Sequence, residues 1–323
     1  MLYRRQLMHS ALLAGTALAL LPAETLAQAV GRLRIFVPAA PGGGWDQTAR
    51  TLEVVLKTNK QIDNAQITNV GGAGGTVGLP QFVNQWKGQG DALMVAGMVM
   101  VGAIIANKSA YSLSQVTPIA RLTGEFEVIV VPPDSPHKDM KSLVAAFKAK
   151  PDAVSWGGGS AGGTDHILAG MIAQAVGVEA SKVAYVAFAG GGPAQAAVLG
   201  GHVTCGVSGF GEFSEQIKAG KMRPLAISAD KRVPGIDVPT LKDQGIDVEL
   251  FNWRGVFAPP GVTDADRAKM TALIEAMVKS PAWQEELKKR DWTDILMTGK
   301  AFEDYVKSDT ARIEGILKQL GLA

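Results

Sequence analysis

The chain has very little cysteine and almost no excess of charge. Cys205 is the single cysteine among 323 residues, which excludes an intrachain disulfide and a cysteine-linked lipid anchor near the N-terminus. Lysine and arginine number 32 against 30 aspartate and glutamate, so a nucleic-acid binder and a polybasic membrane surface are disfavoured. The four histidines are far apart, and no His-Glu-x-x-His, paired-cysteine or EF-hand pattern occurs. We therefore expect no metal site and no cofactor.

The longest apolar stretch near the N-terminus, residues 11–21, is too short to span a membrane. It follows Arg4 and Arg5 and precedes Ala27-Gln28-Ala29, the pattern of a secretory signal peptide with a small-residue cleavage site. We expect residues 1–29 to be removed and the protein to be periplasmic, with Sec and Tat export both open. The remaining 294 residues hold 30 lysine and arginine against 29 acidic residues, a net charge of +1.

Glycine is abundant, at 38 of 323 residues, whereas about 7% is usual. Four strand-like runs lead into glycine clusters that open helix-like segments, at residues 41–44, 71–75, 157–163 and 190–192. Unpaired amides at a helix N-terminus bind anions, and these loops hold almost no lysine or arginine. The pattern favours a small carboxylate over a phosphate. The alternative is that the glycines serve turn geometry alone.

Apolar strand candidates alternate with amphipathic helix candidates, which predicts an α/β protein with a parallel sheet covered on both faces. The expected strands are residues 33–37, 66–70, 92–96, 127–131, 154–156, 183–188, 203–207, 224–228 and 256–258. The expected helices lie near residues 46–57, 79–87, 142–150, 164–176, 193–199, 213–219, 265–279, 281–290 and 299–319.

Two proline-flanked stretches, residues 125–136 and 252–261, have the character of inter-domain crossings. They predict a first lobe made of residues 30–127 and 251–323 around a second lobe of residues 128–250. Two crossings permit a hinge, and a cleft between two lobes is where ligands usually bind.

A different class of protein is suggested by the segment Gly158-Gly159-Ser160-Ala161-Gly162, which matches the nucleophile elbow of α/β serine hydrolases. The later histidines, His166 and His202, lie on the next helix and in a turn, and no oxyanion motif precedes them. A secreted serine hydrolase using Ser160 is therefore the alternative to a binding protein. Gly157, Gly159 and Gly162 also have the spacing of the dinucleotide-binding motif, but the acidic residue expected at the end of the next strand is missing.

Several single residues have two readings. Asp46 and Asp165 suit the first turn of a helix better than a ligand contact. Trp45 either closes over a ligand or packs in the core. Arg254, in the second crossing, is either a ligand or hinge-locking cation or an ordinary ion-pair partner.

The chain resembles the solute receptors of the tripartite tricarboxylate transporters. The resemblance covers the expected mature chain and rests on these segments in order: Pro38-Ala39-Ala40-Pro41-Gly42-Gly43-Gly44-Trp45-Asp46, Asn69-Val70-Gly71-Gly72-Ala73-Gly74-Gly75, Gly159-Ser160-Ala161-Gly162-Gly163-Thr164-Asp165-His166, Ala219-Gly220-Lys221-Met222-Arg223-Pro224-Leu225-Ala226, Val238-Pro239-Thr240-Leu241 and Asn252-Trp253-Arg254-Gly255. The first segment is most similar to the tricarboxylate, or citrate, branch. Thr164 and Pro193 depart from the family pattern.

The resemblance implies a two-lobed, type II-like periplasmic-binding-protein fold, with two doubly wound sheets joined by a two-crossing hinge. It implies a monomer without catalysis, which captures a small tri- or dicarboxylate and delivers it to a large and a small membrane subunit. Carried onto this sequence, the residues that would bind the ligand are Gly43, Gly44, Gly74 and Gly75 for the proximal carboxylate, Ser160, Gly163 and Thr164 from the second lobe, and Gly191 and Ser208 at the far end. Trp45 and Arg254 complete the expected set.

Overall fold

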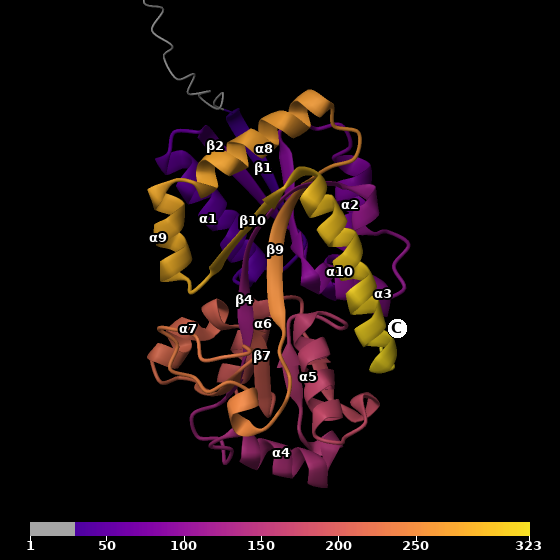
Figure 1. Cartoon of the computed structure of the whole chain (residues 1–323), viewed down its shortest axis with the longest axis vertical. Helices are drawn as coiled ribbons and strands as arrows, with labels where there is room; N and C mark the ends of the chain where they lie inside the picture. The colour runs from indigo at the N-terminus through magenta and orange to yellow at the C-terminus, as the bar shows by residue number, and fades with distance from the viewer. Residues whose placement is uncertain (1–29) are drawn as a thin grey trace, which may run out of the picture.

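The computed structural model describes residues 30–323, so the expected signal peptide and its cleavage site lie outside the described residues. The molecule is elongated and has two halves, joined by two long strands that run along its middle (Figure 1). The strands are β1 (Val30–Val37), β2 (Ile62–Asn69), β3 (Ala92–Gly97), β4 (Thr117–Val131), β5 (Trp156–Gly158), β6 (Tyr185–Ala187), β7 (Cys205–Gly209), β8 (Arg223–Ile227), β9 (Phe251–Ala258) and β10 (Thr293–Thr298).

Helices cover both faces of the strands in each half (Figure 1). In the half that contains β1, β2 and β3, the helices α1, α8 and α9 lie on one side of the sheet, and α2, α3 and α10 on the other. The α-helices are α1 (Gly44–Thr58), α2 (Gly78–Gln85), α3 (Met98–Ala106), α4 (Met140–Ala149), α5 (Thr164–Ala175), α6 (Gly191–Leu199), α7 (Phe210–Lys218), α8 (Asp264–Val278), α9 (Pro281–Lys289) and α10 (Gly299–Gln319).

The sheet is mixed, so the expectation of a parallel sheet was wrong. In the first half the strand order is β2-β1-β3-β9-β4-β10, with β1 parallel to β2 and β3 but β9 antiparallel to both β3 and β4. In the second half it is β8-β4-β7-β5-β6, with β4 antiparallel to β7 and β8. The two sheets share β4 and therefore form one continuous ten-stranded sheet.

The strand β4 is three times as long as the segment expected from the sequence, because it serves both halves. Residues up to Phe126 pair with β9 and β10, whereas Glu127 to Val131 pair with β7 and β8. The β4–β9 ladder stops at the pair Phe126 and Phe251. The hydrogen bonding thus changes partner at the position where the sequence predicts a crossing between lobes.

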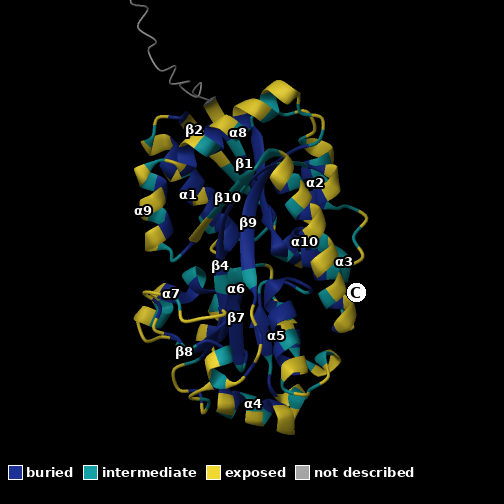
Figure 2. Ribbon diagram, in the orientation of Figure 1, coloured by how far each residue is buried: buried dark blue, intermediate teal, exposed yellow. Residues whose placement is uncertain are grey.

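Two elements were not expected from the sequence. The helix α3 is apolar on all sides, so its sequence shows no helical periodicity, and its buried residues pack between α10, α5 and the loop before α2. The strand β10 shows no alternation and its apolar run, Ile295 to Met297, is short, and its residues are exposed or half-buried at the edge beside β4. Buried residues fill the interior of both halves (Figure 2), and the apolar ones form a large cluster that includes the fully buried Cys205 and a smaller one around Phe213.

Candidate functional site: a cavity between the two lobes

All four glycine loops meet at one small cavity between the halves of the molecule. The cavity has a volume of about 50 Å³. Each loop contributes backbone to its wall, and the residues expected from the sequence that line it are Gly43, Gly44, Trp45, Gly74, Gly75, Gly191, Ser208 and Arg254. Glycines 43 and 44 begin α1, and Gly191 begins α6, so two helix N-termini point toward the same space.

The first and fourth loops are in direct contact across the lobes. The amide of Ala40 donates to the carbonyl of Ala189 at 3.0 Å. A Cβ atom at Gly43 would lie 2.8 Å from the backbone nitrogen of Gly191. Because real Cβ atoms do not approach backbone that closely, glycine is required here for the loops to come together.

Asp46 holds the first loop in shape. It lies in the first turn of α1 and accepts hydrogen bonds from the amide of Gly42 and from the Asn69 side chain, both at 3.0 Å. These bonds and the one from Arg50 keep its pKa low, although burial opposes them. The bonds tie the first loop to the end of β2, which agrees with the first-turn role expected for Asp46.

The third loop places its three expected residues behind the wall of the cavity. Ser160 and Thr164 are buried, and their hydroxyl oxygens have no hydrogen-bond partner among the described residues. A Cβ at Gly74 would lie 3.2 Å from that of Ser160, so the second and third loops also touch. A Cβ at Gly163 would collide with the Ser160 hydroxyl. Ligand contact by Ser160, Gly163 and Thr164 stays a prediction.

Trp45 packs against the second loop while lining the cavity. Its indole is 6% exposed, and a Cβ at Gly75 would lie 2.9 Å from the ring. The ring therefore covers one side of the site and also belongs to the core, which combines the two alternatives left open by the sequence.

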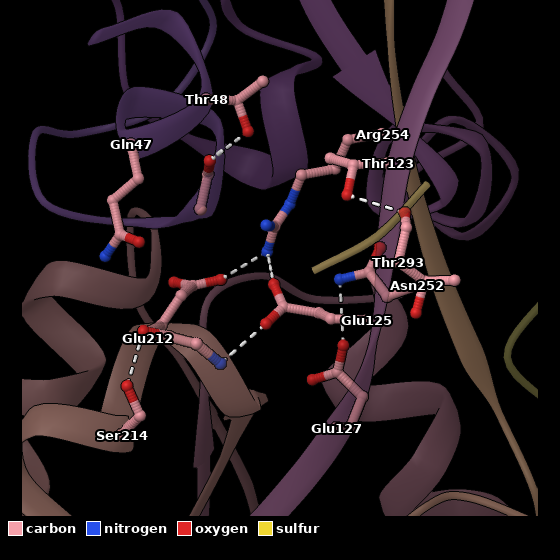
Figure 3. A network of polar contacts seen from close by, with 12 residues as sticks. Gln47, Thr48, Thr123, Glu125, Glu127, Glu212, Ser214, Asn252, Arg254 and Thr293 are labelled. Atoms are coloured by element: carbon pink, nitrogen blue, oxygen red, sulfur yellow. Dashed lines mark hydrogen bonds and ion pairs between the residues drawn. The ribbon is translucent and has the colours of Figure 1, made fainter. Parts of the chain in front are cut away.

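The cavity adjoins a buried group of ionisable side chains, of which sequence reasoning found Arg254 but missed the acidic residues Glu125, Glu127 and Glu212 (Figure 3). The Nη2 atom of Arg254 forms ion pairs with Glu125 and, at 2.9 Å, with Glu212, while its side chain is 1% exposed. Since Arg254 lies on β9 and Glu212 on α7, this pair links the two halves of the molecule. Arg254 is thus both an ion-pair partner and a cavity residue.

Burial changes the ionisation of these carboxyls. It raises the pKa of Glu212 to about 7, against the attraction of Arg254, and that of Asp165 to about 6, against the hydrogen bond from the Gly159 amide. It also raises the pKa of Glu127 well above its ordinary value, helped by the nearby charge of Asp165. The side chain of Asn252 donates to Glu127 at 2.9 Å.

A sequence signal for this group existed. Glu125 and Glu127 are two apart on one predicted crossing, and Asn252 and Arg254 are two apart on the other. Because side chains alternate along a strand, each pair shares a face of its strand. Glu212 carried no such signal, as it begins α7 beyond the crossings.

The geometry does not support catalysis at Ser160. The hydroxyl of Ser160 has no hydrogen bond to a histidine, whereas Nδ1 of His166 accepts from the Gly162 amide at 3.1 Å and its ring stacks on Tyr185.

Within residues 30–323, no group of three or more acidic, histidine or cysteine side chains has the arrangement of a metal site. No helix in that range is sufficiently long and apolar to cross a membrane.

Two α/β lobes that share crossing strands and enclose a cavity of loop amides define the class of periplasmic solute-binding proteins. The sequence matches the family model described as "Tripartite tricarboxylate transporter family receptor" over residues 52–322. The chain belongs to this family. The family and the proteins of the same fold are binding proteins rather than enzymes, so the hydrolase alternative does not hold.

Individual relatives agree in sequence length and in fold. The "UPF0065 protein in gbd 5'region" of Cupriavidus necator is 27% identical over 96% of this chain and 94% of its own. The periplasmic binding protein BugD superposes with a TM-score of 0.82 at 24% identity, over 90% of this chain and 98% of its own. MatC of Rhodopseudomonas palustris, solved with bound malate, has a TM-score of 0.78 at 23% identity, over 89% and 99% of the two chains. At these identities the solved structures establish the shared fold.

Proposed function

We propose that the protein captures a small tri- or dicarboxylate, such as citrate, in the cavity between its lobes and delivers it to a tripartite membrane transporter. The proposal includes export through a signal peptide cleaved near Ala29, a monomeric receptor, and transfer to a large and a small membrane subunit. Lobe 1 would comprise residues 30–127 and 251–323, and lobe 2 residues 128–250.

The observation that carries the proposal is the convergence of four glycine loops on one cavity. The backbone amides of Gly43, Gly44, Gly74 and Gly75 would hold the proximal carboxylate, with Gly191 and Ser208 at its far end. Amides at helix N-termini favour a negatively charged acceptor, although the amide of Gly75 donates to the Gly72 carbonyl at 3.0 Å in this structure. The Nη1 atom of Arg254 is buried at the cavity without a hydrogen-bond partner among the described residues, and a carboxylate oxygen would satisfy it.

A thermal-shift panel tests this proposal on protein freed of bound ligand by unfolding and refolding. Citrate, succinate and adipate are each compared with their methyl esters. The acid that binds is expected to stabilise the protein by about 2.7 kcal/mol at a hundred times its dissociation constant. Its ester is expected to have no effect, because buried amide donors need a charged acceptor. Equal shifts in melting temperature from an acid and its ester, or no shift from any acid, would contradict the proposal.

A further inference from the structure

The wall of the cavity carries carboxyl groups as well as amides. Asp165 is 7% exposed and the Glu212 side chain 8%, and both line the cavity. They belong to a buried set of four carboxyls, with Glu125 and Glu127, near one cation, Arg254, which pairs with Glu125 and Glu212. Figure 3 shows Glu125, Glu127 and Glu212 of this set. The set therefore holds more potential negative charge than positive charge.

The four carboxyls form two pairs. Glu125 and Glu212 both contact Nη2 of the Arg254 guanidinium, and Glu125 accepts a further hydrogen bond from the Gly211 amide at 2.7 Å. Glu127 lies close enough to Asp165 for the charge of Asp165 to raise its pKa, and a proton on one of the two relieves their repulsion. Even with that proton, a negative charge remains in the set when the other three carboxyls are ionised.

Among the described residues, Arg254 is the cation whose charge lowers the pKa of both Asp165 and Glu212, whereas Arg50 on α1 pairs with Asp46 and Arg290 pairs with Glu286. On α5 and β6 the neighbouring titratable groups are His166 and Tyr185, whose rings stack. Burial lowers the pKa of His166 to about 4, so its imidazole is neutral near pH 7. Burial also raises the pKa of Tyr185, so its phenol is neutral as well.

A ligand carboxylate entering this cavity adds one more negative charge to the set. Burying an uncompensated charge is costly, so the new charge requires a counterion. The unpartnered Nη1 of Arg254, on a side chain that is 1% exposed, points to an anionic acceptor in the cavity. A protonated carboxyl removes a charge and also donates a hydrogen bond to a carboxylate oxygen.

We propose that the protein binds its carboxylate together with a proton, which Glu212 or Asp165 carries as a neutral hydrogen-bond donor at the wall of the cavity. This inference rests on the proposed function and assigns binding roles to two residues that the glycine-loop set does not contain. It also defines the ligand as an anionic carboxylate without a cationic group of its own.

Isothermal titration calorimetry directly measures the uptake of protons that accompanies binding. The panel acid with the largest thermal shift is titrated between about pH 6.5 and 8.5, in pairs of buffers that differ in ionisation enthalpy. We expect net proton uptake, with the affinity falling by up to about tenfold for each pH unit once the carrying carboxyl ionises in the free protein. Binding with no uptake and a constant affinity would overturn the proton proposal and leave carboxylate capture intact. Absence of binding at every pH would overturn both.

Glu212→Gln and Asp165→Asn identify the carrier, because an amide of the same shape cannot ionise. The variant at the carrying position is expected to lose the proton uptake and to bind more tightly than the wild type at pH 8.5, by up to about tenfold. Glu215→Gln is the matched control, since Glu215 is on the same helix and its side chain is 82% exposed. Proton uptake retained in both variants would overturn the assignment. Tighter binding of aspartate than of succinate, without proton uptake, would also overturn the assignment. The ionised carboxyls would then bind the ammonium group of aspartate.

Melting of the ligand-free protein provides a second readout that needs no ligand. A carboxyl whose pKa is raised in the folded state binds its proton more tightly there than in the unfolded chain. Its stabilising contribution is therefore present at low pH and is lost as the pH rises through about 6 for Asp165 and about 7 for Glu212. The melting temperature of Glu212→Gln should fall less than that of the wild type between pH 6 and 8. An identical fall would argue against Glu212 as the titrating group.

Discussion

At the scale of single residues, Gly43 allows the two lobes to approach each other closely. Its φ of −86° is open to any residue, so glycine is not required by the backbone. It is required by the neighbour, since a Cβ would lie 2.8 Å from the Gly191 nitrogen in the opposite lobe.

We therefore expect Gly43→Ala to weaken binding of the panel acid by about 1–3 kcal/mol, the usual effect of overpacking. The melting temperature of the ligand-free protein should change little, because separated lobes leave room for the methyl group. Calorimetry and thermal melting check the two effects. Gly315→Ala is the control, since nothing lies within 4 Å of its Cβ position on α10. Normal affinity in Gly43→Ala would show that the ligand-bound loops do not come this close.

At the scale of elements, the strands β4 and β9 separate two environments. On one face of this pair lie Glu125, Asn252 and Arg254, beside the cavity. On the other lie Phe126 and Phe251, whose rings pack edge to face at 5.1 Å. The strict alternation of side chains along a strand produces this division. The same two strands thus carry the ionic link between the lobes and the apolar contact behind it.

The last helix adds another link between the halves. It belongs to the segment predicted for lobe 1, yet Leu320 at its end is 3% exposed and packs on α5, where a Cβ at Gly170 would lie 3.0 Å from its Cδ1. Figure 1 shows the end of α10 lying beside α5.

We expect Leu320→Ala to reduce the free energy of unfolding by about 2 kcal/mol or more, because truncating a buried leucine loses apolar contacts and leaves a cavity. Urea unfolding at 25 °C measures the change. Leu199→Ala provides the comparison, since Leu199 is 42% exposed at the end of α6 and should cost only about 0.5 kcal/mol. Equal losses at the two positions would mean that the contact between α10 and α5 contributes nothing.

At the scale of the whole molecule, the cavity of about 50 Å³ is lined by loops from both halves, so its size depends on how close the lobes lie. We predict that the ligand-free protein favours an open form, in which water satisfies the loop amides, and that ligand closes it. Small-angle scattering should then show a smaller radius of gyration with saturating panel acid than without it. An unchanged scattering curve would rule out closure about the two crossings.

Much of the fold could be predicted from local pattern. The four loops and most of the expected helices follow from hydrophobic periodicity and from glycine placement. The helix α3 and the strand β10 could not, because one is apolar all round and the other is half-exposed at a sheet edge. The mixed sheet could not either, since strand direction depends on segments that are distant in the sequence, such as β3 and β9.

The sequence by itself determined that the chain is an α/β protein of this receptor family, because strand-to-glycine-to-helix units are local features and their order along the chain is specific. Only the tertiary structure decided which buried carboxyl groups the site contains. Glu212 and Arg254 are 42 residues apart, and their ion pair exists because α7 and β9 meet at the junction of the lobes. The burial that raises the pKa of Glu212 and Asp165 is likewise a property of the assembled interior, which no local stretch of sequence encodes.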